Sequence, residues 1–269
     1  HLELLRRTLA ASGAEMPGGV RKAMEAQVRR ETAELLKRGP WQRADQLPQV
    51  FLPGLPAAPW HGRPEELGDF AGGLLSGSRA WAAEAAGTLR EARPALLAEY
   101  DELRRSGALH RETECIHEHG RGEWRNFEVN GVWERRGEDG CASAAPRACS
   151  LTASLRALGM PLLRAGYSAL DAGAWLRPHC GSTNGQLKWH LGLRVPQPEG
   201  CATLRVGNES RPWREGEVLS FDDSFEHEVW NRCPSERVVF QVVFAHPALA
   251  GRAEERRRPE AEMPTALGH

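Results

Sequence analysis

The feature that most constrains the fold is a succession of short apolar segments that begins after about residue 108. Segments rich in Val, Leu, Trp and Phe alternate with turns made of Pro, Gly, Asn, Asp or Glu-Gly. Short strands that alternate with turns are typical of an all-β sandwich or barrel. The last segment is almost entirely apolar, which predicts a strand that is buried on both faces. The clearest segments span residues 189–195, 201–206, 217–222, 227–231 and 237–245.

The part of the chain before residue 108 has a helical pattern instead. Residues 1–39 are highly charged, with apolar residues at helical spacing, and residues 40–62 are a proline-rich connector. Residues 64–107 are predicted to be helical, with Pro94 in a first helical turn and Gly107 as a C-terminal cap. An apolar stripe follows Pro94 at Leu96, Leu97, Tyr100 and Leu103.

These patterns divide the chain into three parts. Residues 1–107 are predicted to be a helical leader and connector that pack on the core, and residues 108–250 form the β-rich domain. Residues 251–269 are a polar tail rich in Arg and Glu.

Charge and hydropathy exclude some classes of protein. The 35 basic and 36 acidic residues leave a net charge of −1, which gives no electrostatic reason to expect nucleic acid as a partner. The sequence has no apolar run near the roughly 18–20 residues that span a bilayer. No membrane span is therefore expected within this chain.

Two histidines in the β-rich half mark a candidate metal site. His179 and His227 are 48 residues apart, on segments that can meet at the mouth of a barrel, and neutral imidazoles suit Fe(II), Zn or Cu. The usual non-haem iron site adds a carboxylate, commonly two positions after the first histidine, but that position is Gly181. Asp222 and Asp223 are the nearest alternative source of a third ligand. On spacing alone, histidines that are hydrogen-bonded to backbone are the more ordinary interpretation.

A candidate anion site follows from a second pattern. Lys188 and His190 alternate along an expected strand, so their side chains point to the same face. Arg237 opens an otherwise apolar strand, where a buried guanidinium needs an anionic partner. A dicarboxylate ligand would supply that partner, because a guanidinium matches carboxylate geometry. The alternative is a salt bridge to an Asp or Glu of the protein, such as Asp222 or Asp223.

The six cysteines form no C-x-x-C pair, which argues against a zinc ribbon or a thioredoxin motif. Cys141 and Cys149 are close in sequence, with Pro146 between them. This spacing is as compatible with two unpaired thiols as with a small disulfide-closed loop.

Three longer segments resemble the catalytic domain of the aspartyl/asparaginyl β-hydroxylases. They are PHCGSTNGQLKWHLGLRVP at 178–196, the segment 200–231 that contains FDDSFEHEVW, and RVVFQVVFAHPAL at 237–249. The resemblance covers about residues 115–249 and is strongest over 165–247. It implies a mainly β protein with N-terminal helices and a double-stranded β-helix core, of the jelly-roll or cupin-like kind. It also implies a dioxygenase that uses Fe(II), 2-oxoglutarate and O₂, with iron held by two histidines and no carboxylate, which would account for Gly181.

Matched residue by residue, the resemblance implies roles for individual side chains. His179 and His227 take the two metal positions. Arg237 takes the place of the arginine that binds the distal carboxylate of 2-oxoglutarate, and Ser168 that of the serine that assists it. His190 takes the position at the carboxylate nearer the iron.

The chain departs from the family at one of these positions. Lys188 stands where a family member has arginine, so a point charge replaces a bidentate fork and weaker cosubstrate binding is expected. The resemblance also implies a disulfide between Cys141 and Cys149.

The function implied is hydroxylation of an unactivated carbon, the β-carbon of Asp or Asn in a protein substrate such as an epidermal-growth-factor-like domain. Hydroxylation of a lipid acyl chain is one alternative. A catalytically silent member that binds a metal or a protein is another, and Lys188 supports it. By resemblance the compartment is the lumen of the endoplasmic reticulum, and the cytoplasm is also compatible with the sequence.

Overall fold

The structure is a computed structural model that describes residues 43–67, 78–114, 116–118, 120–130 and 143–249, with single positions at 26, 30, 33, 37, 39 and 41. Most of the expected N-terminal helix and the whole polar tail lie outside these residues. The division of the chain at residues 107 and 250 therefore stays a prediction.

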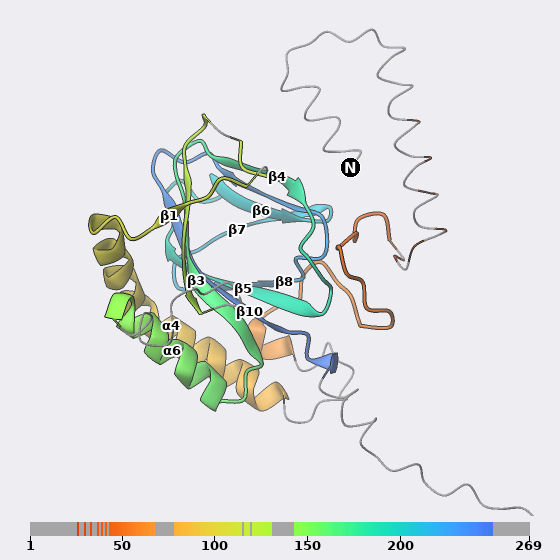
Figure 1. Cartoon of the computed structure of the whole chain (residues 1–269), viewed down its shortest axis with the longest axis horizontal. Coiled ribbons are helices and arrows are strands. Elements are labelled where there is room, and N and C mark those ends of the chain that lie inside the picture. The colour runs from red at the N-terminus through yellow and green to blue at the C-terminus, as the bar shows by residue number, and fades with distance from the viewer. Residues whose placement is uncertain are drawn as a thin grey trace, which may run out of the picture.

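The described chain forms two antiparallel sheets that face each other (Figure 1). The larger sheet has the strand order β1-β2-β3-β10-β5-β8, and the smaller sheet has the order β4-β9-β6-β7. The strands are β1 (His110–Arg111), β2 (Trp124–Asn130), β3 (Leu162–Leu170), β4 (Trp175–His179), β5 (Gln186–Arg194), β6 (Ala202–Val206), β7 (Glu209–Pro212), β8 (Val218–Phe221), β9 (His227–Asn231) and β10 (Arg237–Ala245).

Strands β3 to β10 are shared equally between the sheets, and each strand is followed by one in the other sheet except for β6, which pairs with β7 in the smaller sheet. This is the arrangement of a double-stranded β-helix, so the predicted fold class is confirmed. The five strands expected from the sequence are β5, β6, β8, β9 and β10, and the bounds of β9 and β10 coincide with the prediction.

Helices cover the outer face of the larger sheet (Figure 1). They are α4 (Ser78–Arg105) and α6 (Pro146–Ala157), and a short 3-10 helix η1 (Pro64–Glu66) precedes α4. Their buried side chains form one hydrophobic cluster with the outward-facing residues of β5 and β10. None of the described helices is long and apolar enough to cross a bilayer.

The predicted position of Pro94 in a first helical turn is wrong. Helix α4 begins at Ser78 and continues through Pro94. Buried residues such as Leu89 before Pro94 and Leu96 after it pack in the same cluster. The free energy gained by burying residues on both sides of Pro94 outweighs the loss of the backbone hydrogen bond that proline cannot donate. The predicted cap at Gly107 is confirmed, because its φ is 72° and its N–H donates to the carbonyl of Arg104.

Strand alternation divides the side chains of β5 and β10 between two environments. On β5, Leu187, Trp189 and Leu191 belong to the cluster under the helices. Lys188 and His190 therefore point to the opposite face, between the two sheets. On β10, Val238 and Phe240 belong to the cluster under the helices. Val239, which lies between them, belongs to a second hydrophobic cluster in the interior between the two sheets. The prediction that β10 is buried on both faces is confirmed.

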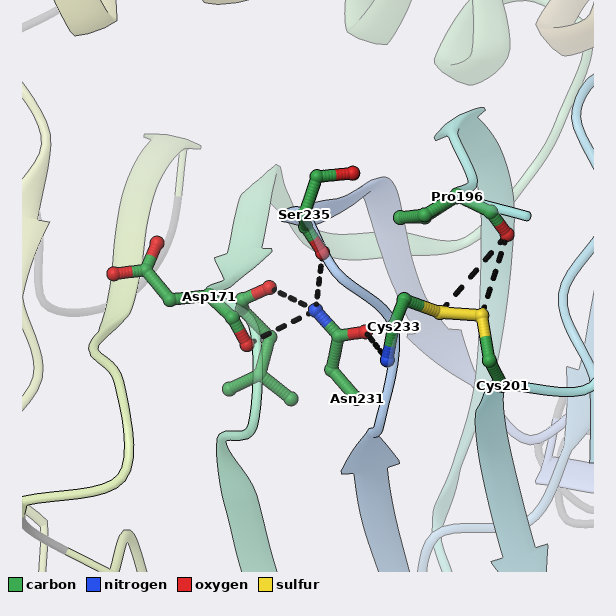
Figure 2. Close-up of a disulfide and its surroundings, with 7 residues drawn as sticks. Asp171, Pro196, Cys201, Asn231, Cys233 and Ser235 are labelled. Carbon is green, nitrogen blue, oxygen red and sulfur yellow. Dashed lines mark hydrogen bonds between the residues drawn. A yellow bond between two sulfur atoms is a disulfide. The ribbon is translucent and has the colours of Figure 1, made fainter. Parts of the chain in front are cut away.

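A disulfide that the sequence analysis did not predict joins Cys201 to Cys233, with a Cα–Cα distance of 5.0 Å (Figure 2). Beside it, the amide of Asn231 donates to the carbonyls of Asp171 and Ser235, and its Oδ1 accepts the N–H of Cys233. These bonds hold the loop between β9 and β10, which leads into Arg237.

Cys149 is also disulfide-bonded. Its predicted partner, Cys141, lies outside the described residues, so this pairing stays a prediction. Cys180 is the free cysteine in the described part of the chain.

Replacing Cys201 and Cys233 together by Ala is expected to lower the free energy of unfolding by about 2–4 kcal/mol. The disulfide joins residues 32 apart in sequence and so restricts the unfolded chain. Urea denaturation of the double variant and of wild type measures the loss. Cys180→Ala, which breaks no disulfide, is the control. Equal unfolding free energies for the double variant and wild type would contradict this expectation.

Candidate active site

Two neighbouring strands of the smaller sheet bring His179 and His227 together. His179 is the last residue of β4 and His227 is the first residue of β9, and the two are paired in the register of these strands. Their ring centroids are 4.1 Å apart. Histidines separated by 48 residues therefore lie side by side in the smaller sheet.

Backbone carbonyls orient both rings. Nδ1 of His179 donates to the carbonyl of Arg177 at 2.6 Å, and Nδ1 of His227 donates to the carbonyl of Phe225 at 2.9 Å. With Nδ1 as the donor, Nε2 of each neutral ring is left with a lone pair. The two open interpretations of these histidines are therefore compatible, because a ring bonded to backbone through one nitrogen can bind a metal through the other.

The surroundings keep both rings neutral. Burial lowers the pKa of His179, and the charge of Lys188 lowers it further. Burial also holds the pKa of His227, which is 4% exposed, well below its usual value, with His179 and Lys188 adding to the effect. Neutral imidazole is the form that binds a metal.

Gly181 leaves no room for a carboxylate ligand at its position. A Cβ atom at residue 181 would lie 2.6 Å from Oδ2 and 2.9 Å from the backbone oxygen of Asp223. The Gly181 N–H also donates to that backbone oxygen at 2.6 Å. No group of three or more His, Cys, Asp or Glu side chains with metal-binding geometry occurs in the described ranges.

Asp223 is instead the partner of Lys188. The Lys188 Nζ lies 2.9 Å from Oδ2 of Asp223, and the amide of Gln186 lies 3.3 Å from the same oxygen. Burial alone would raise the pKa of Asp223, but the charge of Lys188 and the hydrogen bonds from Lys188 and Gln186 lower it. Asp223 is thus a buried carboxylate whose charge is balanced by Lys188.

Arg237 is a buried cation without such a partner. It is 2% exposed, it makes no ion pair with a carboxylate in the described structure, and its Nε has no hydrogen-bond partner. Burial lowers the pKa of its guanidinium to about 9. Nη1 donates to the backbone oxygen of Ser168 at 3.3 Å. The alternative of a salt bridge from Arg237 to Asp222 or Asp223 is wrong.

His190 and Ser168 complete the set of predicted residues. Neither ring nitrogen of His190 has a hydrogen-bond partner, and burial holds its pKa well below the usual value, with Lys188 and Arg237 adding to the effect. The hydroxyl of Ser168 accepts a hydrogen bond from the indole of Trp124 at 3.0 Å. The larger sheet therefore presents buried, partly unsatisfied polar groups to the interior.

The sequence analysis did not identify two members of this site. Trp213, which follows β7, contacts both Arg237 and His190. Asp223 was considered as a metal ligand or a partner of Arg237, whereas it pairs with Lys188. No local pattern around Trp213 distinguishes it from an ordinary core residue.

Fold and site together define a double-stranded β-helix protein with a two-histidine centre. The family described as Aspartyl/Asparaginyl beta-hydroxylase matches residues 90–247. The human aspartyl/asparaginyl beta-hydroxylase is 35% identical over 219 residues, which are 79% of this chain and 26% of that protein. The chain belongs to the aspartyl/asparaginyl β-hydroxylase family.

Two further proteins are similar over shorter or more divergent regions. The ornithine lipid ester-linked acyl 2-hydroxylase of Rhizobium tropici is 44% identical over 86 residues, 32% of this chain and 31% of that protein. A prolyl hydroxylase from Trichoplax adhaerens has a TM-score of 0.42 and 15% identity, covering 61% of this chain and 81% of that one. The chain spans about a quarter of the length of its human relative.

Asp222 gives the site a testable pH dependence. It is fully buried, Oδ1 accepts the N–H of Ser224 and Oδ2 has no hydrogen-bond partner. Burial raises its pKa to about 7. In the unfolded chain this carboxyl ionises near pH 4, whereas in the folded protein it keeps its proton up to about pH 7. Raising the pH from 4 to 7 therefore stabilises the unfolded state, and the free energy of unfolding falls.

Asn cannot ionise, so the variant Asp222→Asn should lack this loss. We expect the unfolding free energy of the variant, relative to wild type, to rise by about 1.4 kcal/mol per pH unit between about pH 4 and 7 and then level off. Denaturant titrations of the metal-free proteins at several pH values measure the difference. Parallel stability curves would show that Asp222 ionises normally in the fold.

Proposed function

We propose that this protein is an Fe(II)- and 2-oxoglutarate-dependent dioxygenase that hydroxylates an unactivated carbon. The observation that carries the proposal is the pair of neutral imidazoles, His179 and His227, whose Nε2 atoms are left available by the bonds of Nδ1 to backbone. They accompany a buried guanidinium, that of Arg237, which has no carboxylate partner in the described structure. A metal and a dicarboxylate would satisfy both groups.

The residues present fit iron. Nε2 of His179 and Nε2 of His227 would hold the metal, and the contact between Gly181 and Asp223 keeps a third protein ligand away from residue 181. Two protein ligands leave several coordination positions for cosubstrate and oxygen. When bound, iron with 2-oxoglutarate and O₂ supplies the oxidising power to insert oxygen into a C–H bond, and 2-oxoglutarate leaves as succinate and CO₂.

The residues of the larger sheet fit the two carboxylates of 2-oxoglutarate. Arg237 would bind the distal carboxylate, with the hydroxyl of Ser168 assisting. His190 would donate to the carboxylate nearer the metal from a ring nitrogen that has no partner in the protein. Lys188 would contact that carboxylate while it also balances Asp223, so we expect weaker binding than an arginine would give.

We propose that the substrate is a protein, hydroxylated at the β-carbon of Asp or Asn. The sequence similarity to the human relative supports this. That the substrate protein carries an epidermal-growth-factor-like domain stays a prediction. The second candidate is a lipid acyl chain, which the similarity to the Rhizobium tropici acyl 2-hydroxylase supports. The disulfide between Cys201 and Cys233 supports an oxidising compartment, in line with the expected lumen of the endoplasmic reticulum.

The double variant His179→Ala with His227→Ala is expected to form no more succinate from 2-oxoglutarate than iron-free wild type does. It removes both imidazoles and leaves no protein ligand for the metal. Succinate is quantified by mass spectrometry after incubation with Fe(II), 2-oxoglutarate and ascorbate. His110→Ala, at an exposed position on β1, is the control. Succinate formation that persists in the double variant would refute the metal site, and a wild type that forms none with either candidate substrate present would indicate a catalytically silent member.

The two substrate candidates are separated by offering each to the wild-type protein under the same conditions. We expect a peptide from an epidermal-growth-factor-like domain to gain the mass of one oxygen atom, at Asp or Asn, as located by fragmentation. An ester-linked acyl lipid should remain unchanged. Oxygen found in the lipid and not in the peptide would favour the second candidate.

A further inference from the structure

Trp213 is a buried aromatic residue that contacts two of the proposed cosubstrate-binding side chains. It follows β7, is 1% exposed and belongs to the hydrophobic cluster between the two sheets. The Cζ atom of Arg237 lies 4.6 Å from the centre of its ring. The ring of His190 is stacked on it, with an interplanar angle of 17° and a centroid distance of 6.1 Å.

Neither partner of Trp213 is well held by hydrogen bonds. Arg237 makes one long bond, to the backbone oxygen of Ser168 at 3.3 Å, and its Nε has no partner. His190 makes none through either ring nitrogen, and its other aromatic contact is an edge-to-face contact with Phe221 at 4.9 Å. The orientation of both side chains therefore depends on packing, and Trp213 is a neighbour that they share. A guanidinium over an indole face is attracted by the ring quadrupole, most strongly where water is excluded.

We propose that Trp213 is a positioning residue that orients Arg237 and His190 to bind the two carboxylates of 2-oxoglutarate. This inference rests on the proposed function. One aromatic ring contacts a residue of β10 and a residue of β5, and so sets the directions of the two anion-binding groups relative to each other. Trp213 does not have to touch the cosubstrate to do this.

A merely structural role makes a different prediction. A tryptophan that only fills the core would cost stability when it is truncated, and the surviving folded protein would bind 2-oxoglutarate normally. The measurement that separates the two roles is cosubstrate affinity, taken independently of turnover. The full chain is loaded with Mn(II) as a substitute for Fe(II), and the dissociation constants of Mn(II) and of 2-oxoglutarate are measured by isothermal titration calorimetry.

Trp213→Leu removes the aromatic face and should weaken 2-oxoglutarate binding by about tenfold or more, while Mn(II) affinity stays within about threefold of wild type. Trp213→Phe keeps a ring against both partners and should retain 2-oxoglutarate affinity within about threefold. Trp81→Leu is the matched control, because it truncates a buried indole in the cluster under the helices. This control should bind 2-oxoglutarate as wild type does.

Three results would contradict either the positioning role of Trp213 or the proposed function, and they can be told apart. If Trp213→Leu binds 2-oxoglutarate as tightly as wild type, or if Trp213→Phe loses as much affinity as Trp213→Leu, the positioning role is wrong. If Mn(II)-loaded wild type itself does not bind 2-oxoglutarate, the proposed function fails. Should Trp213→Leu not fold, Trp213→Met fills more of the indole volume without an aromatic face, and the same affinity loss is expected of it.

Discussion

The structure depends on the alternation of side chains along β5 and β10. One face of these strands contributes apolar residues such as Trp189 and Phe240 to the cluster under α4 and α6. That burial anchors the larger sheet, and it obliges the intervening residues, among them His190 and Arg237, to lie between the two sheets. Polar groups in such a place are costly unless they are satisfied. The unsatisfied atoms on His190 and Arg237 are therefore the strongest physical sign of a ligand site.

The half of the site that contains the two histidines is built differently. His179 and His227 are adjacent because β4 and β9 pair in that register, and backbone carbonyls orient their rings without any carboxylate. Asp223, which precedes His227 in the same segment, is turned to Lys188 and packs against Gly181. A two-histidine centre is thus consistent with the local packing, because a side chain at residue 181 would collide with Asp223. Membership of the aspartyl/asparaginyl β-hydroxylase family agrees with this geometry.

Much of the β-rich half was predictable, because strands of strongly apolar residues between turns carry a clear signal. β9 and β10 coincide with the predicted segments, whereas β3, with Gly166 and several small residues, and the short β4 and β7 were not predicted. Pro94 was misplaced because burial on both sides of it, in α4, is a tertiary effect. The disulfide between Cys201 and Cys233 was missed because nothing in the local sequence relates residues 32 positions apart.

By itself the sequence determined the character of the strands, the same-face placement of Lys188 and His190, and, through long matching segments, the family and the residues with candidate roles. These features depend on the spacing and chemistry of neighbouring residues. Only the tertiary structure decided that Asp223 neutralises Lys188, that Arg237 has no carboxylate partner within the described chain, and that Trp213 contacts both Arg237 and His190. Which charge meets which partner in a closed interior depends on how two sheets and the loop beyond β7 pack, and no local pattern encodes that packing.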